Sequence, residues 1–174
     1  MESGVKMILE TERLILREYT YNDFNELYKI LSCPITMKHY PQPYDEKGTK
    51  RWIEWSLENY QNHGFGWWAV ILKETNKFIG DCGITIQNIN NTMLPEVGYH
   101  INKQYWRNGY AKEAGKAVIE WAFKNTNYDA LYSYMNAENV ASYSTAKSIG
   151  MTKIDEYYDE YEHLYVYKIE KNQN

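Results

Sequence analysis

Several features that mark large classes of proteins are missing from this chain of 174 residues. It has only two cysteines, Cys33 and Cys82, which form no Cys-x-x-Cys pair, so we expect reduced core thiols and no disulfide framework. The N-terminus lacks an apolar signal core, and no apolar run is long enough to span a membrane. These absences predict a cytoplasmic protein with no membrane partner.

Common phosphate, metal and nucleophile motifs are also missing. No Gly-x-x-x-x-Gly-Lys-Ser/Thr run and no Gly-x-Gly-x-x-Gly run occurs, which removes the main support for a P-loop or a dinucleotide-binding fold. The four histidines are scattered and give no ligand pair at metal spacing, so we expect no metal. No Gly-x-Ser-x-Gly elbow or Cys–His signature points to a covalent intermediate. A formal net charge of −4 without a basic stripe argues against nucleic acid as a partner.

The composition that is present fits one globular domain over residues 1–174, with a core from about 10 to 170. Aromatic residues make up 16% of the chain, including eighteen Tyr and six Trp, which predicts aromatic-lined surfaces as well as an aromatic core. Exposed aromatic edges would also suit a homodimer.

Hydrophobic periodicity predicts an alternation of strands and helices. The expected strands are 13–18, 67–72, 78–87, 96–101, 130–135, 151–158 and 164–169. The expected helices are 24–31, about 47–63, 111–122 and 140–148. Strands in consecutive hairpins followed by a strand–helix–strand crossover predict a mixed α/β sheet with helices on its faces.

The segment 105–114 joins a strand to a strongly periodic helix, and it contains the single glycine Gly109. A helix start presents backbone N–H groups without intrahelical partners, so an anion is stabilised there. The basic residues nearby suggest a specific anion site in an acidic protein. They are Lys103, Arg107, Lys112 and Lys116. An ordinary strand–turn–helix junction with solvated lysines is the alternative.

Residues 106–111 (WRNGYA) resemble the acetyl-coenzyme A pyrophosphate loop of the GNAT superfamily of N-acetyltransferases, whose pattern is Gln/Arg-x-x-Gly-x-Gly/Ala. The Trp in the first position, the stretch 11–17 (TERLILR) and the stretch 139–142 (NVAS) with Gly150-Met151 are similar to the RimJ/RimL-like branch, which acetylates the N-termini of ribosomal proteins. The resemblance implies a GNAT fold: a mixed, mostly antiparallel sheet with splayed central parallel strands, helices on both faces and acetyl-coenzyme A in the gap.

The same resemblance implies a set of cofactor-binding residues at the strand end, in the turn and on the helix after the second central strand. They are Tyr99, His100, Ile101, Trp106, Arg107, Asn108, Gly109, Tyr110, Ala111, Lys112, Asn139 and Ser142. A backbone N–H near Tyr99 to Ile101, freed by a bulge at Gly98, would stabilise the oxyanion. Asn139 would bind the pantetheine arm, cap its helix, or do both.

Acetyl transfer to an amine requires a neutral amine, a stabilised oxyanion and a proton for the departing thiolate. Glu96 is the expected base because it lies on the strand that leads into the turn; a strand-edge carboxylate in water is the alternative. Family members place a tyrosine acid at the position of Ala146, so the usual donor is missing. Ser142 and Tyr143 are the available hydroxyls, and Ser142 is preferred by analogy with the branch.

The sequence therefore predicts direct transfer of an acetyl group from acetyl-coenzyme A to a primary amine, either a protein N-terminal α-amine or a small molecule. An aromatic cleft would receive the acceptor, lined by Tyr40, Trp52, Trp55, Trp67 and Trp68. Because of Ala146, a non-catalytic module that binds or senses acyl-coenzyme A is the competing hypothesis.

Overall fold

The computed structural model describes residues 4–172, which form an eight-stranded sheet in the order β1-β2-β3-β4-β5-β6-β8-β7. The strands are β1 (Met7–Glu10), β2 (Leu14–Arg17), β3 (Trp67–Leu72), β4 (Lys77–Ile89), β5 (Thr92–Ile101), β6 (Ala130–Asn136), β7 (Thr152–Tyr158) and β8 (His163–Glu170). The helices are α1 (Phe24–Leu31), α2 (Glu46–His63), α3 (Tyr110–Asn125) and α4 (Val140–Ser148), with single 3₁₀ turns at Tyr21–Asp23 and Lys103–Tyr105.

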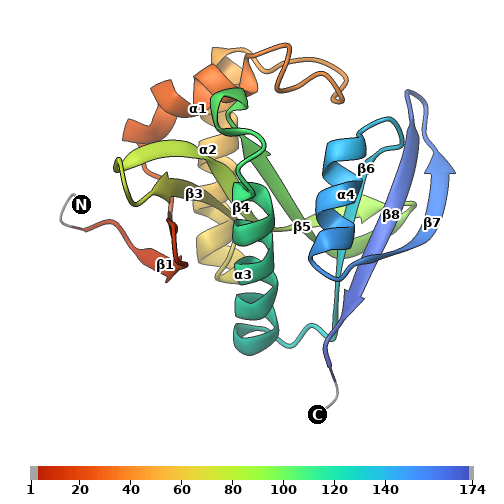
Figure 1. Ribbon diagram of the computed structural model, residues 1–174. Coiled ribbons are helices and arrows are strands. Elements are labelled where there is room, and N and C mark those ends of the chain that lie inside the picture. The colour runs from red at the N-terminus through yellow and green to blue at the C-terminus, as the bar shows by residue number, and fades with distance from the viewer. Residues whose placement is uncertain (1–3, 173–174) are drawn as a thin grey trace.

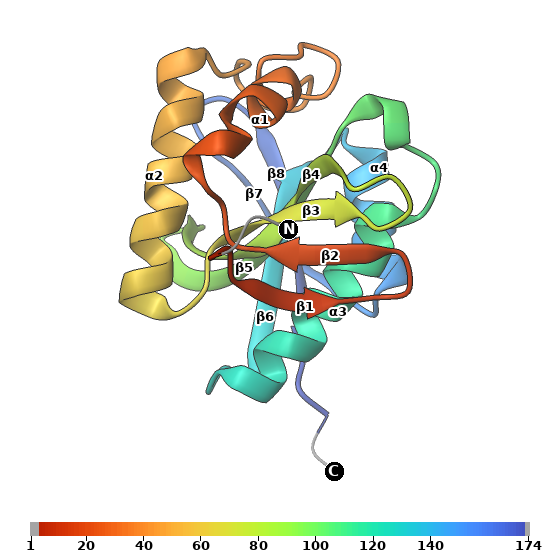
Figure 2. The ribbon, with the colours of Figure 1, turned by 90° about the vertical axis from the view of Figure 1, so that its left-hand side faces the viewer.

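The helices cover the two faces of the sheet in pairs. α1 and α2 lie on one face and α3 and α4 on the other (Figure 2), with α3 beside α4 (Figure 1). Successive side chains of a strand point to opposite faces, so β3 sends Trp67 towards α2 and Trp68 towards α3. The Trp68 ring is fully buried and meets Trp121 of α3 edge to face, with ring centroids 4.8 Å apart.

Local chemistry explains where the elements begin and end. The Asp45 carboxylate accepts a hydrogen bond from the Gly48 N–H and so caps α2, which ends at Gly64 with φ of 77°. Asn90 and Asn91 have φ values of 46° and 64° and form the tight turn between β4 and β5. The helix expected at about 47–63 is therefore confirmed.

The expected fold is confirmed: a mixed, mostly antiparallel sheet with one parallel central pair, β5 and β6, and helices on both faces. The strand β1 was not expected. It pairs with β2 at the edge of the sheet, where its residues are exposed or half-buried, so its sequence shows no clear alternation.

Two smaller expectations are wrong. The β4–β5 register runs without a shift from Gly80↔Ile101 to Ile89↔Thr92, so there is no bulge at Gly98. Cys82 is buried as expected, but Cys33 is partly exposed; both thiols are free. Among residues 4–172, none of the helices combines the length and the apolar character needed to cross a lipid bilayer.

Candidate active site

The sheet opens between β5 and β6, whose only paired residues are Glu96 and Tyr132. On the other side of β5, the Asn102 N–H donates to the Ile79 carbonyl at 2.8 Å. Hydrogen bonds alternate along an antiparallel ladder, so this bond fixes which β5 groups face β4. The N–H groups of Tyr99 and Ile101 turn away from β4, towards the gap. A splayed strand thus provides the main-chain donors that the bulge was expected to provide.

The gap leads to a cavity of about 620 Å³ at the start of α3. Arg107 and Gly109 take left-handed conformations with φ of 63° and 79°, which turn the chain sharply into the helix. A Cβ at Gly109 would contact only the Arg13 Nη2 atom, at 3.5 Å, so the backbone there is open to a ligand. Every expected cofactor-binding residue except Asn108 lines this cavity.

Asn108 has a different place. Its side-chain Nδ2 donates to the carbonyls of Tyr105 and Trp106, at 3.1 Å and 3.0 Å. The Trp106 indole in turn donates to the Ile101 carbonyl at 2.7 Å. Asn108 therefore holds the shape of the turn and does not line the cavity.

The expected basic cluster is only partly brought together. Arg107 and Lys112 line the cavity, joined by Lys38 from the loop after α1. Lys103 and Lys116 lie beside other depressions of the surface. Backbone N–H groups of the first turn of α3 and these three cations together suit a pyrophosphate.

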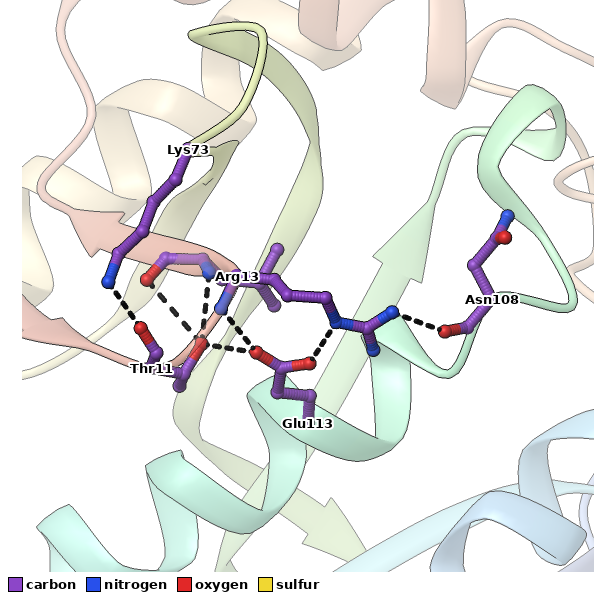
Figure 3. Close-up of polar contacts among 6 residues, drawn as sticks. Thr11, Arg13, Lys73, Asn108 and Glu113 are labelled. Atoms are coloured by element: carbon purple, nitrogen blue, oxygen red, sulfur yellow. Dashed lines mark hydrogen bonds and ion pairs between the residues drawn. The ribbon is translucent and has the colours of Figure 1, made fainter.

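A brace of polar contacts lies behind this turn (Figure 3), and no local pattern in the sequence predicts it. Glu113 of α3 accepts hydrogen bonds from the Thr11 hydroxyl at 2.6 Å and from the Arg13 backbone N–H at 2.9 Å. The Arg13 guanidinium donates to Glu113 Oε2 at 2.6 Å and to the Asn108 carbonyl at 2.9 Å, and it lies over the Tyr110 ring. Thr11 and Arg13 belong to the stretch 11–17 that carries the family resemblance, and the brace gives that stretch a physical role.

A second cavity, of about 650 Å³, lies on the side of α2 and meets the first. Its aromatic walls are Tyr40, Tyr44, Trp52, Trp55, Trp67 and Tyr134. Trp68 was expected here but lies in the core on the opposite face of the sheet. Three carboxylates also line this cavity, Glu96, Asp159 and Glu162, whereas its one arginine, Arg51, is paired with Glu58 at 2.8 Å.

Glu96 is 7% exposed, and the Thr85 hydroxyl lies 3.5 Å from its Oε2 atom. The pKa of Glu96 is raised to about 8. Burial is the largest cause, the Thr85 hydrogen bond acts in the opposite direction, and the charge of Asp81 adds to the increase. Gly98, two residues further along the same face, leaves room for the Trp67 ring and for the carboxylate, because an added Cβ would overlap the ring and lie 3.2 Å from both carboxylate oxygens. A strand-edge carboxylate in water, the alternative considered for Glu96, does not match this burial.

Burial gives Glu96→Gln an expected effect on stability that depends on pH. The folded pKa is about 8, well above the ordinary value of 4.5. Between these values the folded state binds more protons than the unfolded state, so the free energy of unfolding falls as pH rises, by at most about 1.4 kcal/mol per unit. The Gln variant does not lose stability in this way. The melting temperature of the variant minus that of the parent should therefore increase from about pH 5 to about pH 8. A difference that stays constant over this range would contradict the raised pKa.

The hydroxyl candidates on α4 are placed differently from one another. Ser142 lines both cavities, and its carbonyl accepts a hydrogen bond from the Tyr99 hydroxyl at 2.8 Å. Tyr143 lines neither of these two cavities; its ring packs against Tyr165, under Lys147. This placement is at odds with the expected catalytic role of Tyr143. Ala146 is fully buried.

Asn139 has the capping role expected for it. Its side chain accepts a hydrogen bond from the Ser142 N–H at 3.1 Å and so caps α4. It also lines both cavities, and its role in binding the pantetheine arm stays a prediction.

A buried polar network joins the cavities, and its residues are too far apart in the sequence to be predicted from it. Asp81 of β4 is fully buried and accepts from the Tyr19 hydroxyl at 2.8 Å and from the Trp52 indole at 3.0 Å. Its other oxygen lies 2.8 Å from His100 Nδ1, and His100 Nε2 lies 2.6 Å from the Tyr40 hydroxyl. Within residues 4–172 no group of three or more His, Cys, Asp or Glu side chains is arranged to hold a metal ion.

A sheet that opens between two parallel strands, with the start of a helix beside the opening, is the architecture of an acyl-transferring enzyme. The chain belongs to the acetyltransferase (GNAT) domain family, whose sequence profile matches residues 13–152. It is 33% identical over 149 residues to the uncharacterized protein YkkB of Bacillus subtilis (strain 168), covering 85% of this chain and 87% of that one. Further relatives are named as uncharacterized N-acetyltransferases, and the chain is an N-acetyltransferase of this superfamily.

Solved structures agree on the fold. An acetyltransferase from Agrobacterium tumefaciens str. C58 superposes with a TM-score of 0.82 and 29% identity, over 94% of both chains. RimL, a ribosomal L7/L12 alpha-N-protein acetyltransferase solved in complex with coenzyme A, superposes with a TM-score of 0.78 but is only 16% identical, over 95% of this chain and 98% of that one. At that identity the likeness to RimL shows the fold alone. The family profile confirms the superfamily, and the RimJ/RimL-like branch stays a prediction.

Proposed function

We propose that this enzyme binds acetyl-coenzyme A in the cavity at the start of α3 and transfers its acetyl group directly to a primary amine held in the aromatic cavity. The observation that carries the proposal is that the two cavities meet at the gap between β5 and β6, where Glu96 and the main-chain donors lie. RimL, of the same fold, was solved with coenzyme A, which supports the choice of cosubstrate.

The proposed roles on the coenzyme A side follow from placement. The N–H groups of Tyr110, Ala111 and Lys112 bind the pyrophosphate with help from Arg107, since the first intrahelical bond of α3 is donated by Glu113 to Gly109. Trp106 fixes the end of β5, and Ile101 and Asn139 lie along the pantetheine arm. The Tyr99 N–H is aimed into the gap and stabilises the oxyanion.

Glu96 supplies the base. An α-amine has a pKa near 8 in water, and the buried Glu96 carboxyl has a pKa of about 8. Because the two values match, the ammonium of the acceptor can pass its first proton to Glu96 at little cost in free energy, which leaves a neutral amine for attack. A lysine side chain near 10.4 would need more help, so the site favours a less basic amine.

The lining of the acceptor cavity indicates the class of acceptor. Flat aromatic walls bind an apolar or aromatic body. Three carboxylates against one paired arginine favour a second positive charge on the acceptor, near Asp159 and Glu162. We therefore propose a primary amine with an aromatic or apolar body and a second cationic group, either a peptide N-terminus or a small molecule.

A thiol-release assay with acetyl-coenzyme A and matched acceptors tests this proposal. Tripeptides Ala-Phe-Lys and Ala-Phe-Glu, both amidated at the C-terminus, differ in the charge next to the aromatic residue. We expect coenzyme A release in step with N-acetylated peptide, and kcat/KM about tenfold higher for the lysine peptide, a difference of about 1.4 kcal/mol. Glu162→Gln should reduce the ratio of kcat/KM between the lysine peptide and the glutamate peptide. Binding of acetyl-coenzyme A without thiol release from any peptide or small amine would favour the non-catalytic acyl-coenzyme A module.

A further inference from the structure

The reaction needs a second proton transfer that Glu96 does not provide. After the first proton has left the ammonium, the attacking amine must lose one more, and the departing sulfur must gain one. The α4 helix has no tyrosine for this step, because Ala146 is fully buried and the Tyr143 ring is packed against Tyr165. Ser142 is the one hydroxyl side chain of α4 that lines both cavities, so the donor is either Ser142 or a group from another element of the fold.

Tyr40 is placed where such a group is required. It lies in the loop between α1 and α2 and lines both cavities, as His100 of β5 does. As a residue it is 39% exposed at the cavity wall, while its hydroxyl is directed inwards to His100 Nε2, at 2.6 Å. Its oxygen is thus held at the junction where the amine and the thioester meet.

The bonds behind Tyr40 fix the direction of proton movement. Asp81 accepts from the Tyr19 hydroxyl and the Trp52 indole, so its remaining oxygen accepts the Nδ1–H of His100. With the proton on Nδ1, His100 Nε2 is the acceptor for the Tyr40 O–H. The lone pairs of the Tyr40 oxygen then remain free to accept a proton from the cavity.

We propose that Tyr40, His100 and Asp81 form a proton relay that moves the second proton of the attacking amine to the departing sulfur, within the acetyl transfer proposed above. As the amine nitrogen bonds to the thioester carbon, its proton passes to the Tyr40 oxygen and the Tyr40 proton passes to His100 Nε2. When the C–S bond breaks, His100 returns that proton to Tyr40, and Tyr40 protonates the sulfur. The products are the acetamide and the free thiol, and the relay ends as it began.

The surroundings of the relay suit a concerted transfer. Burial, followed by the nearby carboxylates Glu96 and Asp81, raises the pKa of Tyr40 well above its ordinary value, so the hydroxyl stays protonated at rest. The imidazolium formed in the middle of the cycle lies against the Asp81 carboxylate, which stabilises its charge. The register of the sheet pairs Asp81 with His100, so the two side chains share one face of adjacent strands.

The test begins with Tyr40→Phe, which removes the hydroxyl and keeps the ring. We expect kcat to fall by about 10²-fold or more, with the Kd for acetyl-coenzyme A and the melting temperature unchanged. His100→Gln should cause a similar loss, and the double variant should lose little more than either single variant, because a relay acts as a unit. Tyr21→Phe, the same change on an exposed ring that lines neither cavity, is the matched control and should keep the parental rate.

A readout that needs no acceptor accompanies the kinetics. In the ¹⁵N spectrum of the imidazoles, with His100 assigned from His100→Gln, the parent should carry its proton on Nδ1, and Tyr40→Phe should shift the Nε2 signal. A proton on Nε2 in the parent would overturn the relay. The relay would also be overturned if the parent is active and Tyr40→Phe has the parental kcat, or if Ser142→Ala alone lowers kcat. A parent that releases no thiol with any amine would overturn the proposed function, and the relay with it.

Discussion

Glu96→Gln is expected to lower kcat by about 10²- to 10³-fold, because the amide can accept no proton from the acceptor ammonium. The carboxylate is the active form, and its pKa is about 8, so kcat/KM of the parent should rise with pH up to about 8 and then level off. In the variant, the pH dependence of kcat/KM should reflect only the ionisation of the acceptor amine. Steady-state kinetics from about pH 6 to about pH 9.5 measures both effects.

Two comparisons separate a catalytic loss from a structural one. Glu120→Gln makes the same change on the exposed side of α3 and should leave kcat unaltered. Titration calorimetry should give Glu96→Gln the parental Kd for acetyl-coenzyme A, since Glu96 lines only the acceptor cavity. A Glu96→Gln enzyme with the parental rate at every pH would remove Glu96 from the mechanism.

Gly109→Trp is expected to abolish measurable binding of acetyl-coenzyme A, a loss of at least about 10²-fold in affinity. The position is open, so an indole there would occupy the space proposed for the pyrophosphate and cover the first N–H groups of α3. The left-handed backbone, with φ of 79°, adds strain of about 1–2 kcal/mol for any L side chain. Titration calorimetry with acetyl-coenzyme A and with free coenzyme A gives the result.

Gly64→Trp is a matched control for that experiment. Gly64 ends α2 with φ of 77°, has no neighbour within 4 Å of an added Cβ and lines neither cavity. It should suffer the same backbone strain and lower the melting temperature to a similar degree while acetyl-coenzyme A binding is retained. Tight binding to Gly109→Trp would mean that the turn at 105–114 is a structural junction and not the cofactor site.

The parts of this fold that are encoded locally could be predicted from the sequence. Helix α4 has the predicted bounds, because Asn139 caps it and a glycine follows it. The turn at Gly109 was found because a glycine between a strand and a periodic helix is a local signal. Strand β1 was missed because an edge strand whose residues are only exposed or half-buried needs no alternating pattern.

The parts of the site that depend on pairing between distant strands could not be predicted. Asp81 has no local signal, and only the β4–β5 register places it beside His100. Trp67 and Trp68 were assigned to one cleft although neighbouring strand residues face opposite layers, so that error was avoidable. The main-chain donors near Tyr99 result from the separation of β5 from β6, which no residue type encodes.

The contact between Arg13 and Glu113 joins positions 100 residues apart, so it closes a loop that contains four of the eight strands, β2 to β5. Closing such a loop costs chain entropy, and contacts of large sequence separation become favourable only after the segments between them have ordered. The cofactor turn is therefore completed only when the N-terminal hairpin docks against α3. Coenzyme A therefore binds only to a chain whose N-terminal hairpin has docked. It stabilises the complete fold and not a chain that is only partly folded.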